Sequence, residues 1–392
     1  MMRRMSRRSL MWVAFLALLA VAQTASALTL SDFVIFSGGS LTIDAGDETA
    51  IGGHTAVNGN IGSNQDLFMQ GNPQPNYPAQ LNGSAYAGGN LTFGQDLTVG
   101  SSSGPLREVV ANGEASIGGG ANIYGNLYGN AVTLGGSTGI RQVGGVGGNV
   151  QYTTSYDDTS TSVVEGSVSS PSSKTFSLIA MPTATNITAG VVNQPVPAGE
   201  YSSLTVAPGA WGALSTSAQN QTVLLSSGNY SFDSIDVNHG YFTLKIDLTS
   251  GQPINIYSVE GMDFNQHNVI MVTTNGGVSY VPLSSAPQLA SLIYWETNGT
   301  FTMGGASDGE HNIWGGTLYA SYGSPGGGDV NIGQYMDWYG AAYAYDSFDT
   351  ADHGKWTYVP IPEPSSAILS LIGLTFAGIS SRRRRRSRSI PQ

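Results

Sequence analysis

Short apolar–Thr–apolar triplets recur along the chain and predict β-strands that are buried on one face. In a strand, alternate side chains point to opposite faces, so the apolar residues of each triplet face inward and the threonine faces outward. The body of the chain shows no apolar stripe with a helical period. We therefore expect an all-β body. The triplets are Leu41-Thr42-Ile43, Leu91-Thr92-Phe93, Leu97-Thr98-Val99, Val132-Thr133-Leu134, Leu204-Thr205-Val206, Phe242-Thr243-Leu244 and Phe301-Thr302-Met303.

Gly-Asn pairs stand before apolar residues at several places and predict sharp corners, because both residue types tolerate positive φ angles. Short strands joined by such corners, without helices between them, favour a Gly-rich parallel β-solenoid of the β-helix type. The spacing is irregular, so no repeat length follows, and an antiparallel β-sandwich or jelly roll is the alternative. The pairs are Gly59-Asn60, Gly89-Asn90, Gly125-Asn126, Gly129-Asn130 and Gly148-Asn149.

The first 27 residues have the order of a secretory signal peptide. Four arginines precede an apolar run from Leu10 to Ala22, which is too short to span a bilayer, and the small residues Ala25-Ser26-Ala27 follow. The export machinery and signal peptidase read this arrangement. We expect cleavage after Ala27, with an uncleaved signal anchor as the alternative.

Residues 359–392 combine three elements. A Pro-rich stretch is followed by an apolar run of 17 residues, from Ser365 to Ser381, and then by a basic block. The run lies at the short end of the ~17 to 25 residues that cross a hydrocarbon core, so it predicts a single transmembrane helix. The basic block holds the end of the tail in the cytoplasm and places the body across the membrane. This block comprises Arg382, Arg383, Arg384, Arg385, Arg386 and Arg388.

This tail resembles the PEP-CTERM sorting signal of Gram-negative bacteria. The resemblance rests on the triplet Pro362, Glu363 and Pro364, on the apolar run and on the arginines, in that order at the C-terminus. It implies that an exosortase-type membrane enzyme recognises the triplet and removes the tail. The protein would be anchored transiently in the inner membrane and would reach the cell surface or extracellular matrix. The alternative is a permanent anchor.

The body divides by composition into three parts. We expect a Gly/Asn-rich solenoid over 28–151, a Ser/Thr-rich linker or extruded loop over 152–189, and a second β part over 190–358 that continues the solenoid. The residues 58–149, 312–320 and 338–342 resemble the choice-of-anchor A family of bacterial surface proteins. This resemblance implies a Gly-rich β domain joined to a sorting tail, and it assigns no molecular activity.

Charge and cysteine content narrow the partners. There is no cysteine, so an exported chain must be stabilised by its core and hydrogen bonds alone. Ten of the 15 basic residues lie in the two ends, whereas 25 of the 26 acids lie in the body, which leaves the body near −20. Such a surface excludes nucleic acid and anionic lipid as partners. The basic residues of the body are Arg107, Arg141, Lys174, Lys245 and Lys355.

Asp346, Asp349 and Asp352 form a candidate calcium site, since Ca²⁺ takes hard oxygen ligands. Their spacing matches neither an EF-hand nor an RTX repeat, and solvated loop acids are the alternative. The five histidines lack zinc-site spacing, and no Gly-x-Ser-x-Gly elbow is present. We therefore expect no catalytic residue and no cofactor other than this calcium.

Aromatic residues concentrate in the C-terminal half, where Trp314, Trp338 and Tyr339 are candidates for stacking on sugar rings. The alternative is that they fill the core. A ladder of outward threonines would suit an ice-binding surface, but the irregular spacing argues against it. We expect a non-enzymatic structural or adhesive protein of the envelope or exopolysaccharide matrix, with extracellular polysaccharide as partner. A secreted carbohydrate-active enzyme, either a polysaccharide lyase or a glycoside hydrolase with two carboxylates, is the alternative.

Overall fold

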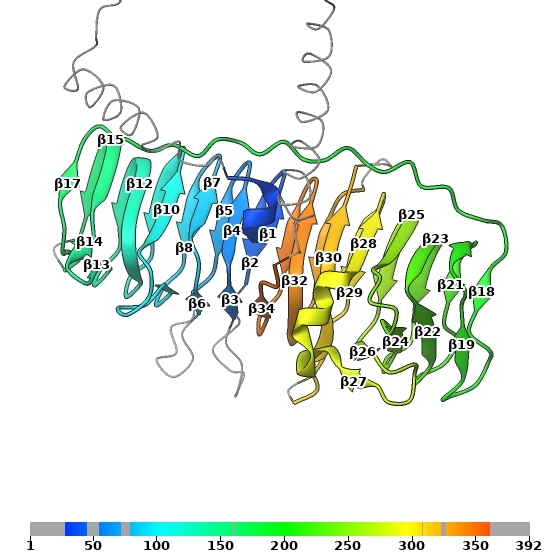
Figure 1. Ribbon diagram of the computed structural model, residues 1–392. Coiled ribbons are helices and arrows are strands. Elements are labelled where there is room, and N and C mark those ends of the chain that lie inside the picture. Colours follow the sequence, from blue (N-terminus) through cyan, green and yellow to red (C-terminus); the bar gives the residue numbers. More distant parts are fainter. Residues whose placement is uncertain are drawn as a thin grey trace, which may run out of the picture.

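The chain folds into a rod-shaped parallel β-solenoid (Figure 1), which confirms the predicted fold class. The computed structural model describes residues 28–44, 55–71, 79–159, 161–307, 309–322 and 327–360. A full coil contains three strands, and each pairs in parallel with the equivalent strands of the coils before and after it. Neighbouring coils thereby satisfy each other's backbone groups at the strand spacing of about 4.8 Å.

The three strands of a coil lie on three faces, which we name the strap face, the open face and the third face, in chain order. Six long strands bend through a corner and serve more than one face: β12 (Asn122–Leu134), β15 (Val150–Asp158), β23 (Gly228–Val237), β25 (Ile254–Phe264), β30 (Asn312–Ala320) and β32 (Met336–Ala344). The strap face also contains β1 (Phe33–Ser37), β4 (Asn60–Ser63), β7 (Ala85–Ala87), β10 (Arg107–Ala111), β17 (Val168–Ser169), β20 (Gly209–Ala210) and β28 (Ile293–Thr297). The open face also contains β2 (Leu41–Ile43), β5 (Leu67–Met69), β8 (Leu91–Phe93), β11 (Glu114–Ile117), β18 (Gln194–Pro195), β21 (Leu214–Ser215), β29 (Thr300–Met303), β31 (Val330–Ile332) and β33 (Phe348–Thr350).

The third face and the additions to the coils complete the rod. The third face also contains β3 (Ala56–Asn58), β6 (Gln80–Leu81), β9 (Thr98–Val99), β13 (Gly139–Val143), β16 (Val163–Val164), β19 (Ser203–Thr205), β22 (Thr222–Ser226), β24 (Thr243–Asp247), β26 (Val269–Thr273) and β34 (Lys355–Thr357). The additions are β14 (Val146–Gly147) and β27 (Val281–Pro282), which pair antiparallel with β13 and β26, and three short 3₁₀ helices, η1 (Leu30–Asp32), η2 (Leu283–Ser285) and η3 (Pro287–Leu292).

The alternation predicted from the triplets holds in the strands. In β2 and β8 the two apolar residues are buried and the threonine between them is partly exposed. The interior is filled by one large hydrophobic cluster that runs along the rod. Its largest members include Trp338 and Trp356, whose stacked ring centroids lie 5.3 Å apart, and Trp295 and Trp314, at 5.1 Å.

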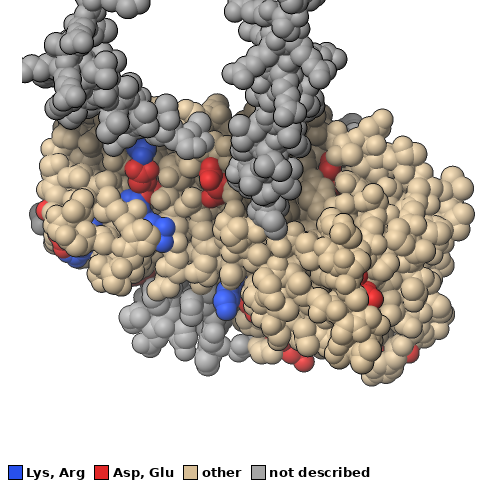
Figure 2. Space-filling model, viewed as in Figure 1, with Lys and Arg blue, Asp and Glu red and all other residues tan. Residues whose placement is uncertain are grey.

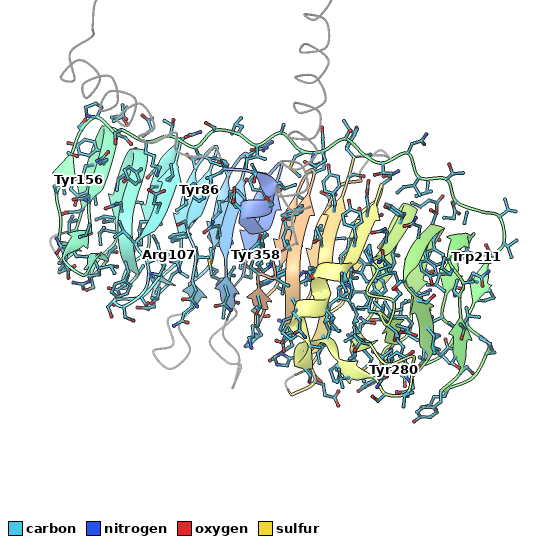
Figure 3. The ribbon with its side chains drawn as sticks, viewed as in Figure 1. Tyr86, Arg107, Tyr156, Trp211, Tyr280 and Tyr358 are labelled. Atoms are coloured by element: carbon cyan, nitrogen blue, oxygen red, sulfur yellow. The ribbon has the colours of Figure 1, made fainter. Side chains whose placement is uncertain are left out.

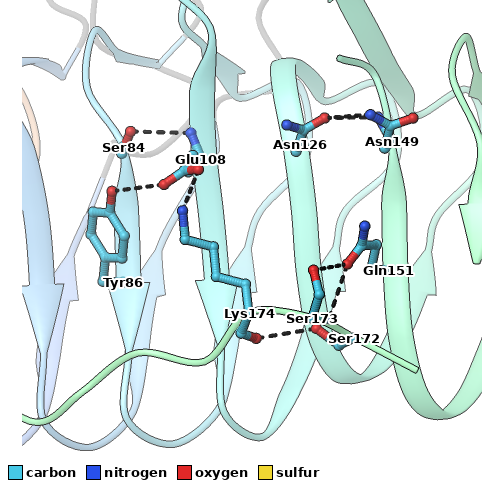
Figure 4. Close-up of polar contacts among 9 residues, drawn as sticks. All are labelled: Ser84, Tyr86, Glu108, Asn126, Asn149, Gln151, Ser172, Ser173 and Lys174. Atoms are coloured by element: carbon cyan, nitrogen blue, oxygen red, sulfur yellow. Dashed lines mark hydrogen bonds and ion pairs between the residues drawn. The ribbon is translucent and has the colours of Figure 1, made fainter. Parts of the chain in front are cut away.

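Asparagine side chains tie successive coils together at the corners. The Asn60 side chain accepts a hydrogen bond of 2.9 Å from the backbone N–H of Ser84, 24 residues later. Asn149 donates to Asn126 at 3.0 Å across 23 residues (Figure 4). Equivalent bonds elsewhere span 18 residues, from Asn149 to Ser167. This variation in coil length explains why the sequence shows no fixed repeat.

The order of coils along the rod differs from the order along the chain (Figure 1). The first half winds from β1 in the middle of the rod to β17 at one end. Residues 170–193, which we call the strap, then run along the rod to β18 at the other end, and the second half winds back to the middle. There the last coil pairs with the first, through β1 with β32, β2 with β33 and β3 with β34. We call this non-consecutive junction the seam.

The strap is held by side chains from both halves of the solenoid. Asn112 donates to the carbonyl of Phe176 and accepts from its N–H, both at 2.8 Å. Asn64 makes the same pair of bonds with Ile179, at 2.7 and 2.8 Å. In the second half the carboxylate of Glu296, only 2% exposed, accepts two bonds of 2.7 Å from Thr185.

A second hydrophobic cluster lies between the strap and the outside of the strap face. Phe176 and Ile179 of the strap cover Phe33 and Phe36 of β1 and Tyr86 of β7. Burial raises the pKa of Tyr86 to about 12. Close by, Lys174 of the strap pairs with Glu108, and the hydroxyl of Tyr86 donates to the same carboxylate (Figure 4). The strap is therefore packed as part of the fold.

The predicted linker or loop, 152–189, takes two forms. Its first residues continue β15 and form β16 and β17, and the remainder forms most of the strap. The two ends of the body meet at the seam, where the Tyr358 hydroxyl donates to the carbonyl of Ser31 at 2.5 Å. Figure 3 places Tyr358 in the middle of the rod, between Tyr156 towards one end and Trp211 towards the other.

Candidate functional site

The open face carries a continuous row of outward side chains along the whole rod. Strand pairing places one such residue from each coil beside the next, and all of them are partly or fully exposed. Hydroxyl, amide and carboxylate groups dominate. From one end to the other the row reads Pro195, Ser215, Asp236, Asp263, Thr302, Asn331, Asp349, Thr42, Phe68, Thr92, Ser116, Thr133 and Asp157.

A groove of about 590 Å³ lies on this face in the second half of the rod. Three carboxylates line it, from Asp236 on β23 and from Glu260 and Asp263 on β25. The rest of the lining is mostly polar or small, with Ile235 and Met262 as its larger apolar members. The polar and small members are Ser234, Asn238, Gly261, Gly299, Thr300, Thr302 and Gly327. This combination of carboxylate, amide and hydroxyl groups can hydrogen-bond to a polyhydroxylated ligand.

Asp236 and Asp263 lie side by side because β23 and β25 pair in register. Partial burial and the neighbouring charge of Asp236 raise the pKa of the Asp263 carboxyl above its ordinary value. Asp236 instead accepts a hydrogen bond of 3.0 Å from Asn238. The two carboxylates thus stand in unequal environments within one groove.

A second groove of about 260 Å³ adjoins the first and shares Thr302 with it. It is lined by Asp44, Asn331 and Asp349 among others, so it reaches the seam. Burial, followed by the charges of Asp349 and Asp352, raises the pKa of Asp44. Uncompensated negative charge therefore extends along the open face from β23 to β2.

Phe68 is an exposed aromatic residue in the middle of the open face. Its side chain is 37% exposed, and its strand neighbours are Thr42 and Thr92. An aromatic ring flanked by hydroxyl groups is suited to stack on a sugar ring while its neighbours donate hydrogen bonds.

The basic residues of the body all lie off the open face. Arg107 is on β10 of the strap face, and Lys174 is on the strap. Arg141, Lys245 and Lys355 are on β13, β24 and β34 of the third face. In the view of Figure 2, Lys and Arg side chains appear in the left half of the molecule only, whereas acids appear in both halves.

The structure does not bring the predicted calcium ligands together. Asp349 points outward from β33, Asp346 is exposed before it, and Asp352 is 8% exposed and pairs with His353 at 2.9 Å. In the described part of the chain, no three acidic, His or Cys residues are grouped as a metal ion requires. The prediction of a calcium site formed by this triad is wrong, because the turn after β33 sends Asp352 inward.

The predicted glycan-stacking residues are core residues. Trp314 and Trp338 are fully buried, and Tyr339 is 7% exposed. These rings are therefore not accessible to a glycan, and they fill the solenoid, as the alternative interpretation held. The aromatic ring that is displayed on the open face is Phe68, which sequence reasoning did not single out.

The sorting motif Pro362, Glu363 and Pro364, the apolar run, the Arg382–Arg388 block and the signal peptide lie outside the described residues. None of the helices in the described ranges has the length and apolar character that crossing a bilayer requires.

Sequence reasoning also missed the groove. Asp236 and Asp263 are neighbours in space because one coil separates them along the chain. No pattern in the sequence indicates the length of that coil. The only available signal was the alternation within each strand, which places Asp236 and Asp263 outward once strands are assigned.

Comparison with known proteins identifies the tail. The model of the PEP-CTERM protein-sorting motif matches residues 360–386, so the chain carries this motif, as predicted. Such a signal belongs to exported, cell-surface proteins that an exosortase processes. The choice-of-anchor A resemblance stays a prediction.

In a comparison of the whole chain, no curated protein matches the sequence. A crystal structure of an ice binding protein from an Antarctic bacterium, Flavobacteriaceae, matches with a TM-score of 0.26 and 10% identity, over 86% of this chain and 99% of that chain. This TM-score is too low to establish a relationship between the two proteins.

Proposed function

We propose that this exported, PEP-CTERM-sorted protein is a non-enzymatic adhesive component of the envelope or exopolysaccharide matrix of a Gram-negative bacterium, held transiently at the inner membrane before an exosortase releases it. Its partner is an extracellular polysaccharide, and the open face is the binding surface. The observation that carries the proposal is the row of outward, mostly polar side chains that continues through the seam along the whole rod.

A long row suits a polymer better than a small molecule. Each coil adds one outward side chain at a spacing of about 4.8 Å, so a polysaccharide laid along the rod meets a similar contact at every coil. Individually weak contacts then add within one chain, as in multivalent binding. The two shallow grooves and the exposed ring of Phe68 give the row places where sugar rings can rest.

Two measurements test this function together. The mature body is applied to a polysaccharide panel, and each ligand is then assayed for new reducing ends. We expect binding without turnover, and we expect Phe68→Ala to weaken binding by about tenfold through the loss of one stacked ring. Val146→Ala is the matched control, because Val146 is 64% exposed on β14, away from the open face, and its loss should leave binding unchanged. Absence of binding to every polysaccharide would refute the proposal.

One observation favours the alternative of a carbohydrate-active enzyme. Asp236 and Asp263 are adjacent carboxylates in one groove, and the pKa of Asp263 is raised, as glycoside hydrolysis requires of a general acid. A polysaccharide lyase is less suited, because no basic residue of the body lies on this face. New reducing ends that disappear in Asp263→Asn would establish the hydrolase in place of the adhesin.

A further inference from the structure

The three faces differ in whether their acidic residues have basic partners. The open face presents Asp236, Asp263, Asp349 and Asp157 in its central row and contains neither Lys nor Arg. Two acids of the other faces have a Lys or Arg partner: Glu165 pairs with Arg141 at 3.1 Å, and Glu108 pairs with Lys174. The negative charge of the open face is therefore not balanced from within the molecule.

The described segments also leave the central row of the open face uncovered. The strap and its hydrophobic cluster occupy the strap face, and η2 and η3 pack against β30 and β32. On the open face, by contrast, the central row stays accessible from end to end. Burial, and after it the repulsion of neighbouring carboxylates, raises the pKa of both Asp44 and Asp263.

We propose that the open face docks a polysaccharide that carries free amino groups, such as a deacetylated amino-sugar polymer. This inference rests on the proposed function and adds the substrate class. Ammonium groups along a sugar polymer would meet carboxylates at Asp236, Asp263 and Asp349, while ring hydroxyls meet Thr302 and Asn331 between them. A uronic-acid polymer would instead face like charge at the same positions.

The test compares two sugar oligomers that differ only in whether their amino groups are free. Fully deacetylated glucosamine oligomers and N-acetylated oligomers of equal length are titrated against the mature body. We expect the deacetylated oligomers to bind about tenfold more tightly or better, since several exposed charge pairs act together. This preference should shrink at 1 M salt, where the Debye length falls to about 3 Å.

Two variants with the same change in net charge distinguish the effect of charge on the open face from the effect of the net charge of the protein. The open-face variant carries Asp236→Asn, Asp263→Asn and Asp349→Asn. The control carries Glu200→Gln, Asp247→Asn and Asp337→Asn, on or beside third-face strands. We expect the open-face variant to lose the preference for the deacetylated oligomer and the control to keep it, with melting temperatures verifying that both are folded.

The outcomes distinguish a failure of this inference from a failure of the proposed adhesive function on which it rests. Equal binding of both oligomers, or equal loss in the two variants, overturns the amino-polymer assignment and leaves the adhesive function standing if neutral polysaccharides bind. Failure to bind any polysaccharide overturns both. A preference for uronic-acid polymers would also overturn the assignment, because it contradicts the charge of the open face.

Discussion

Phe176→Ala tests whether the strap is held by its packing. The Phe176 side chain is 5% exposed, and its ring lies 5.6 Å from that of Tyr86 and 6.4 Å from that of Phe36. Truncating a buried phenylalanine costs about 3 to 5 kcal/mol, and we take the lower bound because the cluster is at the surface. A local loss of about 3 kcal/mol raises the population of the detached strap by about two orders of magnitude.

The rate of trypsin cleavage measures the population of the detached strap. Lys174 is the only basic residue between Arg141 and Lys245, so cleavage after Lys174 reports on the strap alone. In the folded protein its ammonium group pairs with Glu108 and lies 5.6 Å from the centroid of the Tyr128 ring. When the strap opens and closes faster than it is cut, the cleavage rate follows the open population, so Phe176→Ala should be cut about 100-fold faster.

The neighbouring Leu178 provides the matched control. It lies two residues further along the same strap and is 62% exposed, so Leu178→Ala should change the cleavage rate by about threefold at most. Mass spectrometry of the first tryptic fragments identifies the cut. The reasoning fails if Phe176→Ala is cut at the wild-type rate, or if both variants are cut equally fast.

Further predictions concern the core, the corners, the open face and the tail. Trp356→Ala should lower the free energy of unfolding by about 3 to 5 kcal/mol in a denaturant titration, because the ring is fully buried at the seam, whereas the partly exposed Trp211→Ala should cost less. Gly299→Ala should destabilise strongly, because a Cβ there would overlap the carbonyl oxygen of Glu260. Gly136→Ala should cost much less, because its added Cβ would lie 3.3 Å from the side-chain oxygen of Thr161, and melting temperatures measure the difference. The raised pKa of Asp263 means that the native state holds this proton more tightly than the unfolded chain, so stability falls as pH rises from 3.8 through the raised value; Asp263→Asn should therefore raise the melting temperature at pH 7 and not at pH 3. Replacing Pro362, Glu363 and Pro364 by alanine should leave the arginine block on the mature protein, which its intact mass would show.

Local patterns in the sequence predicted the solenoid because they act within one coil. A triplet such as Leu91-Thr92-Phe93 specifies which side chains face inward, and a pair such as Gly59-Asn60 specifies a corner. Both kinds of signal are complete within a few residues. Gly59, with φ of +145°, stands at a corner, and the side chain of Asn60 then bonds to the next coil.

The order of coils could not be predicted in this way. The seam joins residues such as Phe36 and Tyr343, which are far apart in the chain, and no local pattern announces that pairing. The open-face groove depends on the same long-range register, because Asp263 meets Thr302 only after the chain has passed through β26, β27, η2, η3 and β28. The burial of Trp314 was equally hidden, because in Asn312-Ile313-Trp314 the polar Asn312 is buried and the apolar Ile313 between them is only half-buried, which reverses the usual alternation.

The meeting of the two body ends at the seam has a mechanical consequence. The chain leaves the rod after β34, at the corner between the third face and the strap face, and of the three faces the open face lies opposite that corner. Any tether joined there would be attached at the middle of the rod and would leave two arms of about 30 Å each, one on either side. A pull on a polymer bound to either arm becomes a torque about the seam, where the halves are joined by strand pairing and side-chain packing. The strap is the covalent tie across that hinge line, so it opposes the separation of the two arms.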